Sequence, residues 1–141
     1  MKRSAFVLLQ RLDDSSILCV RNSKNKISFP GGKEELIDND FLPVGTKPIA
    51  QFRNACREFQ EEVNKPLPKL QYQHFEWGNP YHVIRIFYAQ VEPMIADKLD
   101  GKIKDIGGDI VQSEWLTLED LDKENVFYHI KKAINIWKIV N

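Results

Sequence analysis

Residues 55–63 read ACREFQEEV, and no other stretch of the chain says as much about the fold. At about 100° per residue, the apolar side chains of this stretch and of the turns before it gather within roughly 60° of a helix surface. They are Ile49, Phe52, Cys56, Phe59 and Val63, with Ala55 at the edge. The pattern predicts an amphipathic helix that buries this apolar face in the core.

Three carboxylates lie on the opposite side of the predicted helix. Glu58, Glu61 and Glu62 have i,i+3 and i,i+4 spacing, so they fall within a sector of about 100°. Like charges so close together repel one another, which predicts a positive partner, either the guanidinium of Arg57 or a bound cation. The carboxylates are hard oxygen ligands, which favours Mg²⁺ or Mn²⁺ over zinc. The residues alone also allow an acidic helix face that is simply solvated.

A sharp turn precedes this helix at residues 29–33, which read FPGGK. The following residues 33–47 show the period of neither a helix nor a strand, so we predict a long loop or an insertion there. Thr46 and Pro48 have the chemistry of a helix cap and first turn, and Asn64 that of a helix end. The helix is therefore expected between these signals.

Short apolar, β-branched or aromatic runs bounded by turn residues predict the strands. They lie at residues 4–10, 16–21, 70–77, 81–91 and 110–116, and residues 27–29 lead into the sharp turn. Residues 13–15 and 78–80 have turn chemistry, which predicts two hairpins.

The last part of the chain is predicted to be mainly helical. Residues 92–108 read as a polar connection, and Thr117 with Asp120 begins a short helical turn. Apolar residues recur with helical spacing over residues 126–140, which indicates an amphipathic helix. With the strands, these elements predict one α/β domain over residues 1–141, in which helices cover both faces of a mixed sheet.

Composition and charge limit the classes of function. A chain of 141 residues with 43% hydrophobic and 28% charged residues is typical of one soluble domain, and no apolar run approaches the roughly 20 residues of a membrane span. The formal net charge of zero gives no sign of a nucleic-acid coat or a membrane contact, so phosphate binding must be local. Cys19 and Cys56 lie in apolar stretches, so we expect free thiols and a cytoplasmic location.

The turn at residues 29–33 and the stretch at residues 55–63 together resemble the signature of the Nudix hydrolases. That signature is written as Gly, five residues, Glu, seven residues, then Arg-Glu-apolar-x-Glu-Glu-x-Gly-apolar. Its Arg-Glu-x-x-Glu-Glu part is complete here, and residues 113–121 are similar to the closing segment of such domains. The resemblance covers nearly the whole chain and implies a Nudix-type α/β/α sandwich, with a mixed β-sheet flanked by helices.

The chain departs from that signature in two places. The interval between Gly32 and Arg57 is about eleven residues longer than usual. The first glutamate of the signature, which usually braces the loop against the helix, therefore falls on Ile49 when counted back from Arg57, or on Asp38 when counted forward from Gly32. Asn64 replaces the glycine after the helix, a mild change because asparagine also tolerates the left-handed conformation.

What the resemblance implies about activity is the hydrolysis of a phosphoanhydride bond with Mg²⁺ or Mn²⁺ as cofactor. The implied metal ligands are Glu58, Glu61, Glu62 and the carbonyl of Gly31. Bound cations would neutralise phosphate charge and lower the pKa of an attacking water. The implied catalytic residues are Arg57, which would orient Glu58, together with Glu58, Glu61 and Asp109. Asp109 precedes the last predicted strand and is the candidate additional ligand or general base.

The expected substrate is a nucleotide or another nucleoside-diphosphate-linked small molecule. Lys33 and Arg85 are the candidate phosphate contacts, and Phe29 and Trp77 are candidate contacts for the rest of the substrate, because a base can stack on an aromatic ring. Capped RNA is an alternative substrate, and a non-catalytic nucleotide or RNA sensor is an alternative function. We expect no membrane partner and a monomer or homodimer.

Overall fold

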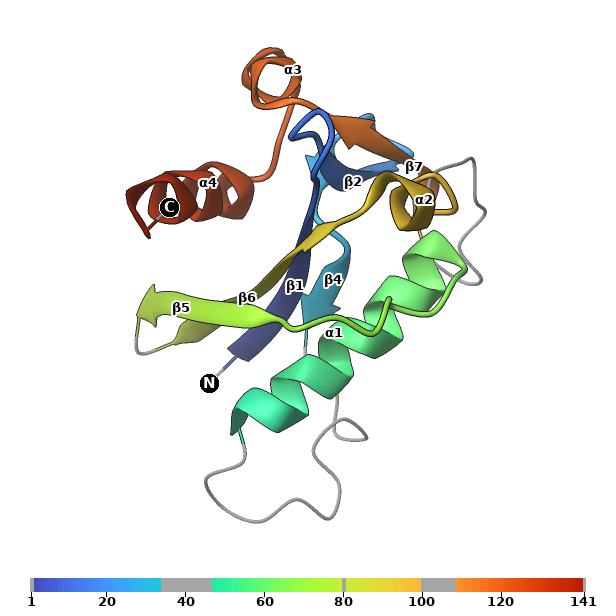
Figure 1. The fold of residues 1–141 in the computed structure, drawn as a ribbon. Helices are drawn as coiled ribbons and strands as arrows, with labels where there is room; N and C mark the ends of the chain where they lie inside the picture. The colour runs from blue at the N-terminus through green and yellow to red at the C-terminus, as the bar shows by residue number, and fades with distance from the viewer. Residues whose placement is uncertain (1, 34–46, 80, 100–108, 141) are drawn as a thin grey trace.

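The computed structural model describes residues 2–33, 47–79, 81–99 and 109–140, as shown in Figure 1. The strands are β1 (Lys2–Arg11), β2 (Ile17–Asn22), β3 (Ile27–Ser28), β4 (Gly31–Lys33), β5 (Gln73–Asn79), β6 (His82–Val91) and β7 (Ile110–Leu116). The helices are α1 (Lys47–Val63), α2 (Pro93–Ala96), α3 (Leu118–Lys123) and α4 (Tyr128–Val140).

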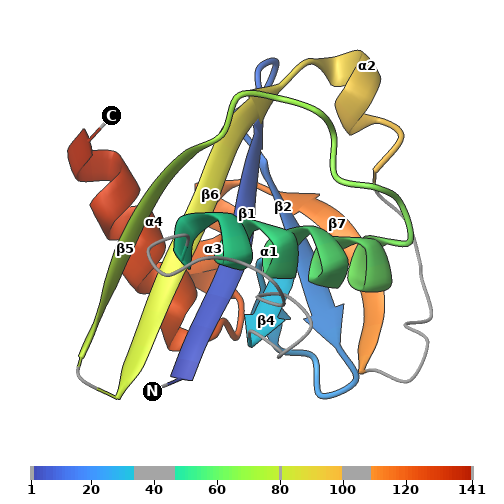
Figure 2. The same ribbon diagram turned by 90° about the horizontal axis from the view of Figure 1, so that it is seen from below.

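All the described strands belong to one mixed sheet. Its order is β3-β2-β1-β6-β5, with β4 also beside β1 and β7 beside β2. The central pair β1 and β6 is parallel, and the pairs β1–β4, β5–β6 and β2–β7 are antiparallel. Helix α1 covers one face of the sheet and α4 the other (Figures 1 and 2). The predicted α/β/α sandwich with a mixed sheet is therefore confirmed.

Only one of the two predicted hairpins is a full ladder. Strands β5 and β6 pair along the whole of β5. Strands β1 and β2 share the single pair Gln10↔Ile17, because β4 occupies the same edge of β1 from Ser4 to Phe6. The space between the diverging strands β1 and β2 thus admits the two glycines of the turn.

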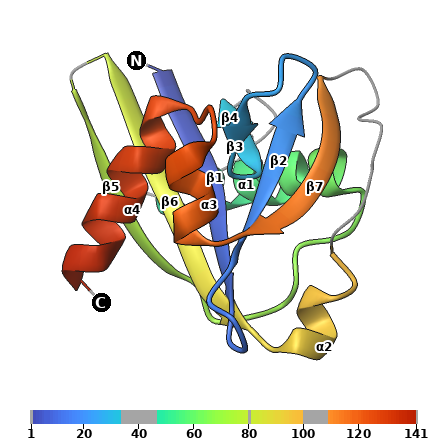
Figure 3. The ribbon, with the colours of Figure 1, turned by 90° about the horizontal axis from the view of Figure 1, so that it is seen from above.

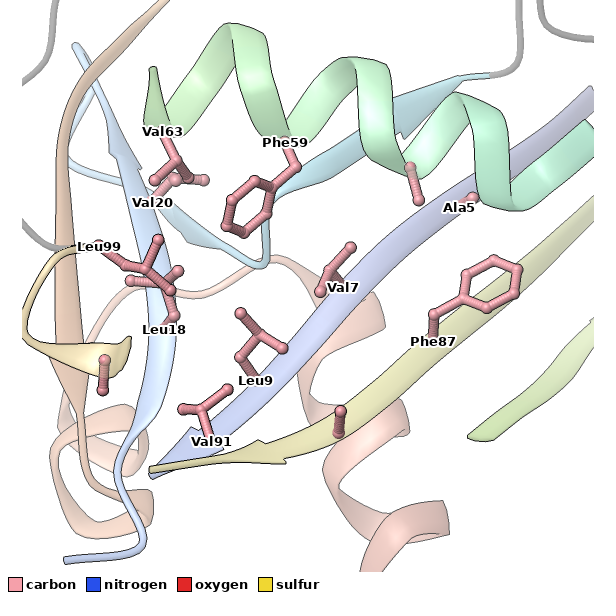
Figure 4. Close-up of a cluster of buried hydrophobic side chains, with 13 residues drawn as sticks. Ala5, Val7, Leu9, Leu18, Val20, Phe59, Val63, Phe87, Val91 and Leu99 are labelled. Carbon is pink, nitrogen blue, oxygen red and sulfur yellow. The ribbon is translucent and has the colours of Figure 1, made fainter. Parts of the chain in front are cut away.

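The apolar run in β1 is continuous because β1 is buried on both faces. Ala5, Val7 and Leu9 belong to the cluster under α1, whereas Phe6 and Leu8 belong to the cluster on the α4 side. Figure 4 shows the first cluster, with side chains of β1, β2, β6 and α1 meeting in one layer. In Figure 3, α3 and α4 lie over the second face.

The buried face of α1 differs from the predicted one. Phe59 and Val63 are fully buried as expected, but Ile49 is 56% exposed. Three polar side chains, Gln51, Asn54 and Glu62, are buried instead. The buried face is thus shifted toward the carboxylates, because β4 lies under that side and its backbone supplies hydrogen-bond partners for Asn54 and Glu62.

The ends of α1 agree with the sequence where they are described. The helix ends at Val63, and Asn64 takes the left-handed conformation with φ of 60°, as predicted. The expected cap, Thr46, and most of the predicted insertion at 33–47 lie outside the described residues. Three short elements were not predicted: β3 before the turn, β4 within the turn and α2 within the polar connection.

The C-terminal elements also follow the prediction. Thr117 and Asp120 form a reciprocal capping box at the start of α3, with hydrogen bonds of 3.1 and 3.0 Å. Helix α4 buries Ile130, Ala133 and Ile134. Both cysteines are free thiols, and none of the described helices is long and apolar enough to cross a membrane.

The start of α4 is anchored by His129. Its ring stacks on Phe6, with ring centroids 4.1 Å apart, and its Nε2 atom lies 3.0 Å from the hydroxyl of Ser28. Burial, together with smaller effects of the charges of His82 and Lys26, lowers the pKa of His129 to about 4. His129 is therefore neutral in the folded protein at neutral pH.

Because the buried face of α1 is shifted, truncating Phe59 and truncating Ile49 should have different costs in stability. Phe59→Ala should lower the free energy of unfolding by about 3–5 kcal/mol, because it empties a fully buried site. Ile49→Ala, the matched control on the same helix, should change it by less than about 0.5 kcal/mol. Urea unfolding at equal m-values measures both. Equal costs would mean that the apolar stripe, including Ile49, is the buried face.

The depressed pKa of His129 predicts a loss of stability on acidification. In the unfolded chain the ring takes up a proton near pH 6.5, whereas in the folded protein it does so near pH 4. The contribution is therefore present above pH 6.5 and is lost as the pH falls toward 4, by about 2 kcal/mol between pH 7 and 5. His129→Phe should reduce this dependence in urea unfolding, and parallel pH curves would contradict the assignment.

Candidate active site

Gly31 lies where no side chain fits. Its φ is 149°, and a Cβ atom built on it would lie 2.2 Å from the backbone oxygen of Ala5 in the neighbouring strand. Glycine therefore allows β4 to approach β1 closely. The N–H of Gly31 donates a hydrogen bond of 2.7 Å to Oε1 of Glu62, which attaches the turn to the end of α1.

Gly32 lies directly against Glu58. A Cβ atom built on Gly32 would lie 2.9 Å from the carboxyl carbon of Glu58, and its nearest neighbours are all atoms of this carboxylate. The carbonyl of Gly32 accepts a hydrogen bond of 2.8 Å from Nδ2 of Asn54. The absence of a side chain at Gly32 therefore leaves room for one of the predicted metal ligands.

Arg57 is paired with two of the carboxylates. Its Nη1 atom lies 3.1 Å from Oε1 of Glu58 and 3.3 Å from Oε1 of Glu61. Its Nη2 atom donates to Oδ1 of Asn54 at 2.8 Å. The sequence predicted a positive partner for the carboxylates, and Arg57 meets that expectation in this structure.

The three carboxylates have different environments. Glu58 is half-buried, Glu61 is exposed and Glu62 is buried, so the expectation of one shared face opposite the core is wrong for Glu62. The buried carboxylate of Glu62 accepts a hydrogen bond from the N–H of Gly31.

The chemistry of these residues suits a divalent cation, but their positions do not form a complete binding site. Glu58 and Glu61 provide hard oxygens on adjacent turns, which suits Mg²⁺ or Mn²⁺. Among the residues that the structure describes, however, no three His, Cys, Asp or Glu side chains are grouped closely enough to hold a metal ion. A cation bound by both Glu58 and Glu61 would compete with the Nη1 atom of Arg57, which contacts both carboxylates.

Asp109 is hydrogen-bonded to a turn of the sheet. It precedes β7, its carboxylate accepts from the hydroxyl of Ser23, and its carbonyl accepts from the Ser23 N–H at 3.0 Å. These bonds attach Asp109 to the turn after β2 and not to α1. Its role as general base stays a prediction, as does that of the Gly31 carbonyl as a metal ligand.

Two of the four predicted substrate contacts are buried away from the carboxylates. Phe29 has no exposed surface and belongs to the core on the α4 side. Arg85 is buried beneath α1, where its Nε donates to Gln51 at 2.7 Å and its Nη2 to Glu76 at 2.5 Å. In this structure Phe29 is therefore a core residue, and Arg85 links β6 to α1 and β5. Neither side chain is exposed for contact with a substrate.

The other two predicted contacts remain accessible. Lys33 is exposed on β4, next to Gly32. Trp77 is half-buried on β5, where it stacks on Phe75 and packs against the cluster on the α4 side. Trp77 thus lies on the face of the sheet opposite α1 and its carboxylates. A substrate that contacts both would have to pass around the rim of the sheet.

One site residue was missed by the sequence analysis. Asn54 is fully buried and hydrogen-bonds both to the turn and to Arg57. Helical spacing could have indicated Asn54 as a site residue, because positions 54, 57 and 58 lie on one side of a helix. A lone asparagine within an apolar pattern did not reveal that a strand would lie beneath it.

The same substitution should have a large effect on stability at Gly31 and a small one at Gly32. Gly31→Ala should destabilise the protein by about 3 kcal/mol or more, because its Cβ would overlap backbone and φ is unfavourable. Gly32→Ala should cost about 1 kcal/mol or less, because only the flexible end of Glu58 must move. Any activity of the site should fall at least tenfold in Gly32→Ala. Thermal unfolding and turnover measure the two effects, and a stable Gly31→Ala protein would refute the close approach.

Solved structures share this fold at low sequence identity. The NUDIX domain of Shewanella oneidensis NrtR, crystallised with ADP ribose, has a TM-score of 0.64 and 12% identity, covering 99% of this chain and 88% of its own. An Ap4A hydrolase from C. elegans has a TM-score of 0.63 and 14% identity, covering 97% of this chain and 96% of its own. A MutT NUDIX hydrolase from Burkholderia pseudomallei has a TM-score of 0.61 and 17% identity, covering 95% of each chain.

These similarities establish the fold. No family model matches the chain, and no curated protein matches its sequence. The architecture is nevertheless that of the Nudix domains along nearly the whole chain. The resemblance deduced from residues 29–33 and 55–63 is therefore confirmed at the level of the fold, and the activity has to be argued from the site itself.

Proposed function

We propose that the protein is a Mg²⁺- or Mn²⁺-dependent hydrolase of nucleoside-diphosphate-linked compounds, in which water attacks a phosphoanhydride bond. The observation that carries the proposal is the placing of Glu58 directly over Gly32, with Arg57 shared between Glu58 and Glu61. A non-catalytic surface has no need to hold carboxylates against a turn without side chains. The arrangement suits a site that receives phosphates and cations together.

Each residue of the site has a proposed part in this reaction. Glu58, Glu61 and Glu62, with the carbonyl of Gly31, would hold the cations, which when bound neutralise phosphate charge and acidify water. Arg57 holds Glu58 and Glu61 in place by its ion pairs. Lys33 is exposed at the end of β4 and would contact a phosphate.

Two further assignments concern proton transfer and the nucleoside. Asp109 is exposed and ionisable, and we propose it as the general base or an additional ligand once substrate is bound. The nucleoside would contact the half-buried Trp77 at the rim of the opposite face. We expect a monomer or homodimer, and the two free thiols support the proposed cytoplasmic location.

The proteins with the same fold support this class of substrate. One was crystallised with ADP ribose and another is an Ap4A hydrolase. ADP ribose and Ap4A each contain a nucleoside joined to a second group through phosphoanhydride bonds. A nucleoside joined to a second group through at least two phosphates is therefore the substrate class that we propose. Capped RNA contains the same type of linkage and is the alternative substrate within this class.

A non-catalytic nucleotide or RNA sensor is the second candidate function, and one observation favours it. The Nη1 atom of Arg57 already pairs with both Glu58 and Glu61, which offsets part of their mutual repulsion without a cation. Turnover distinguishes the two functions, because a sensor would bind a nucleotide tightly without cutting it.

A substrate panel tests the proposal. The purified protein is incubated with nucleoside di- and triphosphates, dinucleoside polyphosphates, ADP-ribose and capped RNA, with Mg²⁺, with Mn²⁺ and with chelator. We expect turnover of at least one compound that disappears in chelator. Tight binding of one compound without any turnover would support the sensor instead.

Charge-removing variants locate the reaction. Glu58→Gln and Glu61→Gln should each lower kcat by about 100-fold or more, because each removes a charge worth several kcal/mol to the metal-assisted step. The matched control is Glu119→Gln on α3, an exposed acid paired with Lys123, which should leave kcat unchanged. Full activity of Glu58→Gln would place the reaction elsewhere on the protein.

A further inference from the structure

We propose that Asn54 is a positioning residue of this site, whose carboxamide fixes the Gly32 carbonyl and the Arg57 guanidinium in one arrangement. This inference rests on the proposed function, since it concerns how the same site is held in its working geometry. Asn54 contacts no expected ligand directly. It acts through Arg57 on Glu58 and Glu61, and through Gly32 on the turn.

The contacts of Asn54 use both ends of its side chain. Nδ2 donates to the carbonyl of Gly32 and Oδ1 accepts from Nη2 of Arg57, each over 2.8 Å. The residue has no exposed surface, so water cannot replace either partner. A buried amide with both groups satisfied fixes its neighbours firmly, because loss of either bond leaves a buried polar group without a partner.

The partners also determine the orientation of the amide. A backbone carbonyl such as that of Gly32 only accepts hydrogen bonds, and the guanidinium of Arg57 only donates them. The nitrogen of Asn54 must therefore face Gly32 and the oxygen must face Arg57. A rotated amide would lose both bonds, so the side chain has one permitted state.

Asn54 supplies one attachment between β4 and α1, and others come from Arg57 and Glu62. The Nη2 atom of Arg57 lies 3.5 Å from the carbonyl of Lys33, and Glu62, about two turns further along the helix than Asn54, accepts from the N–H of Gly31 at 2.7 Å. The bonds to the successive residues Gly31 and Gly32 fix the strand relative to the helix, in addition to its pairing with β1. Because Gly31 and Gly32 have no side chains, the backbone groups carry this attachment.

The bond to Arg57 extends the attachment to the carboxylates. The Nη2 atom of Arg57 is held by Asn54, and the Nη1 atom of the same planar group contacts Glu58 and Glu61. A guanidinium is rigid and planar, so holding one nitrogen restrains the positions that the other can take. The positions of both carboxylates relative to the turn therefore depend on Asn54.

Ile49 does not supply this brace. It occupies one of the two positions where the sequence allowed for the bracing glutamate, but its side chain is apolar and 56% exposed. The other position, Asp38, lies outside the described residues. Asn54 is a buried polar residue of α1 that joins turn and helix in the described structure, and we assign the bracing to it.

The test compares Asn54→Ala with Gln51→Ala as its matched control. Gln51 is also a buried amide of α1, but its oxygen accepts from Arg85 on β6 instead of binding Arg57. Both variants should lower the melting temperature, because each removes a buried hydrogen bond. Only Asn54→Ala should lower kcat, by about 30-fold or more with KM changed less than threefold, and only it should raise the Mn²⁺ concentration for half-maximal activity.

A third variant separates the two bonds. Asn54→Asp keeps an oxygen for Arg57 but places a second oxygen against the Gly32 carbonyl, so it should release the turn while keeping the guanidinium in place. Its kcat should fall less than that of Asn54→Ala. An equal fall would mean that the attachment to Gly32 alone matters, and that the proposed link to Arg57 is wrong.

Amide hydrogen exchange tests the inference without any activity. In metal-free protein, Asn54→Ala should speed exchange of the backbone amides at residues 31–33 at least tenfold relative to wild type, and Gln51→Ala should not. If wild-type protein hydrolyses nothing in the panel, the proposed function fails while the exchange result still decides the role of Asn54. The inference would be wrong if Asn54→Ala kept the exchange rates and the kcat of the wild-type protein. It would also be wrong if Gln51→Ala changed both quantities as much as Asn54→Ala does.

Discussion

The attachment of β4 to α1 is the interaction on which the rest of the site depends. Gly31 and Gly32 let β4 lie close beside β1 and under the helix, and the helix holds that strand by Glu62 and Asn54. The close approach is possible because neither glycine has a Cβ atom, which would overlap its neighbours. It explains both why the first hairpin opens and why α1 buries a polar side.

Burying polar groups on α1 has a cost that the structure offsets locally. An unpaired buried amide or carboxylate destabilises a fold, whereas one with hydrogen-bond partners does not. Glu62 and Asn54 have such partners in β4, and Arg57 distributes one positive charge between Glu58 and Glu61. A bridging cation would need to contact both Glu58 and Glu61, and the Nη1 atom of Arg57 already occupies that position. Metal binding, as we propose it, must therefore move the guanidinium or the carboxylates.

The structural similarities support the fold, whereas the function is proposed from the residues of the site. The sandwich is shared over nearly the whole chain with Nudix domains that are less than 20% identical to it in the structures compared above. A fold conserved at such identity carries many activities, so function has to be argued from residues. The proposed function is supported by the exposed Lys33 and by the group formed by Arg57, Glu58 and Glu61. Phe29 and Arg85 do not support it, because both are buried.

The sequence alone determined the helix, its left-handed end at Asn64, most strands and the two motifs that identify the fold, because local periodicity and turn chemistry record backbone preferences directly. It also predicted that the carboxylates need a positive partner, since charge spacing on a helix is local. Only the tertiary structure decided which side of α1 is buried and that Asn54 joins the turn to Arg57. Those outcomes depend on a strand formed by residues more than twenty positions earlier, and hydrogen bonds across such a separation leave no period in the sequence.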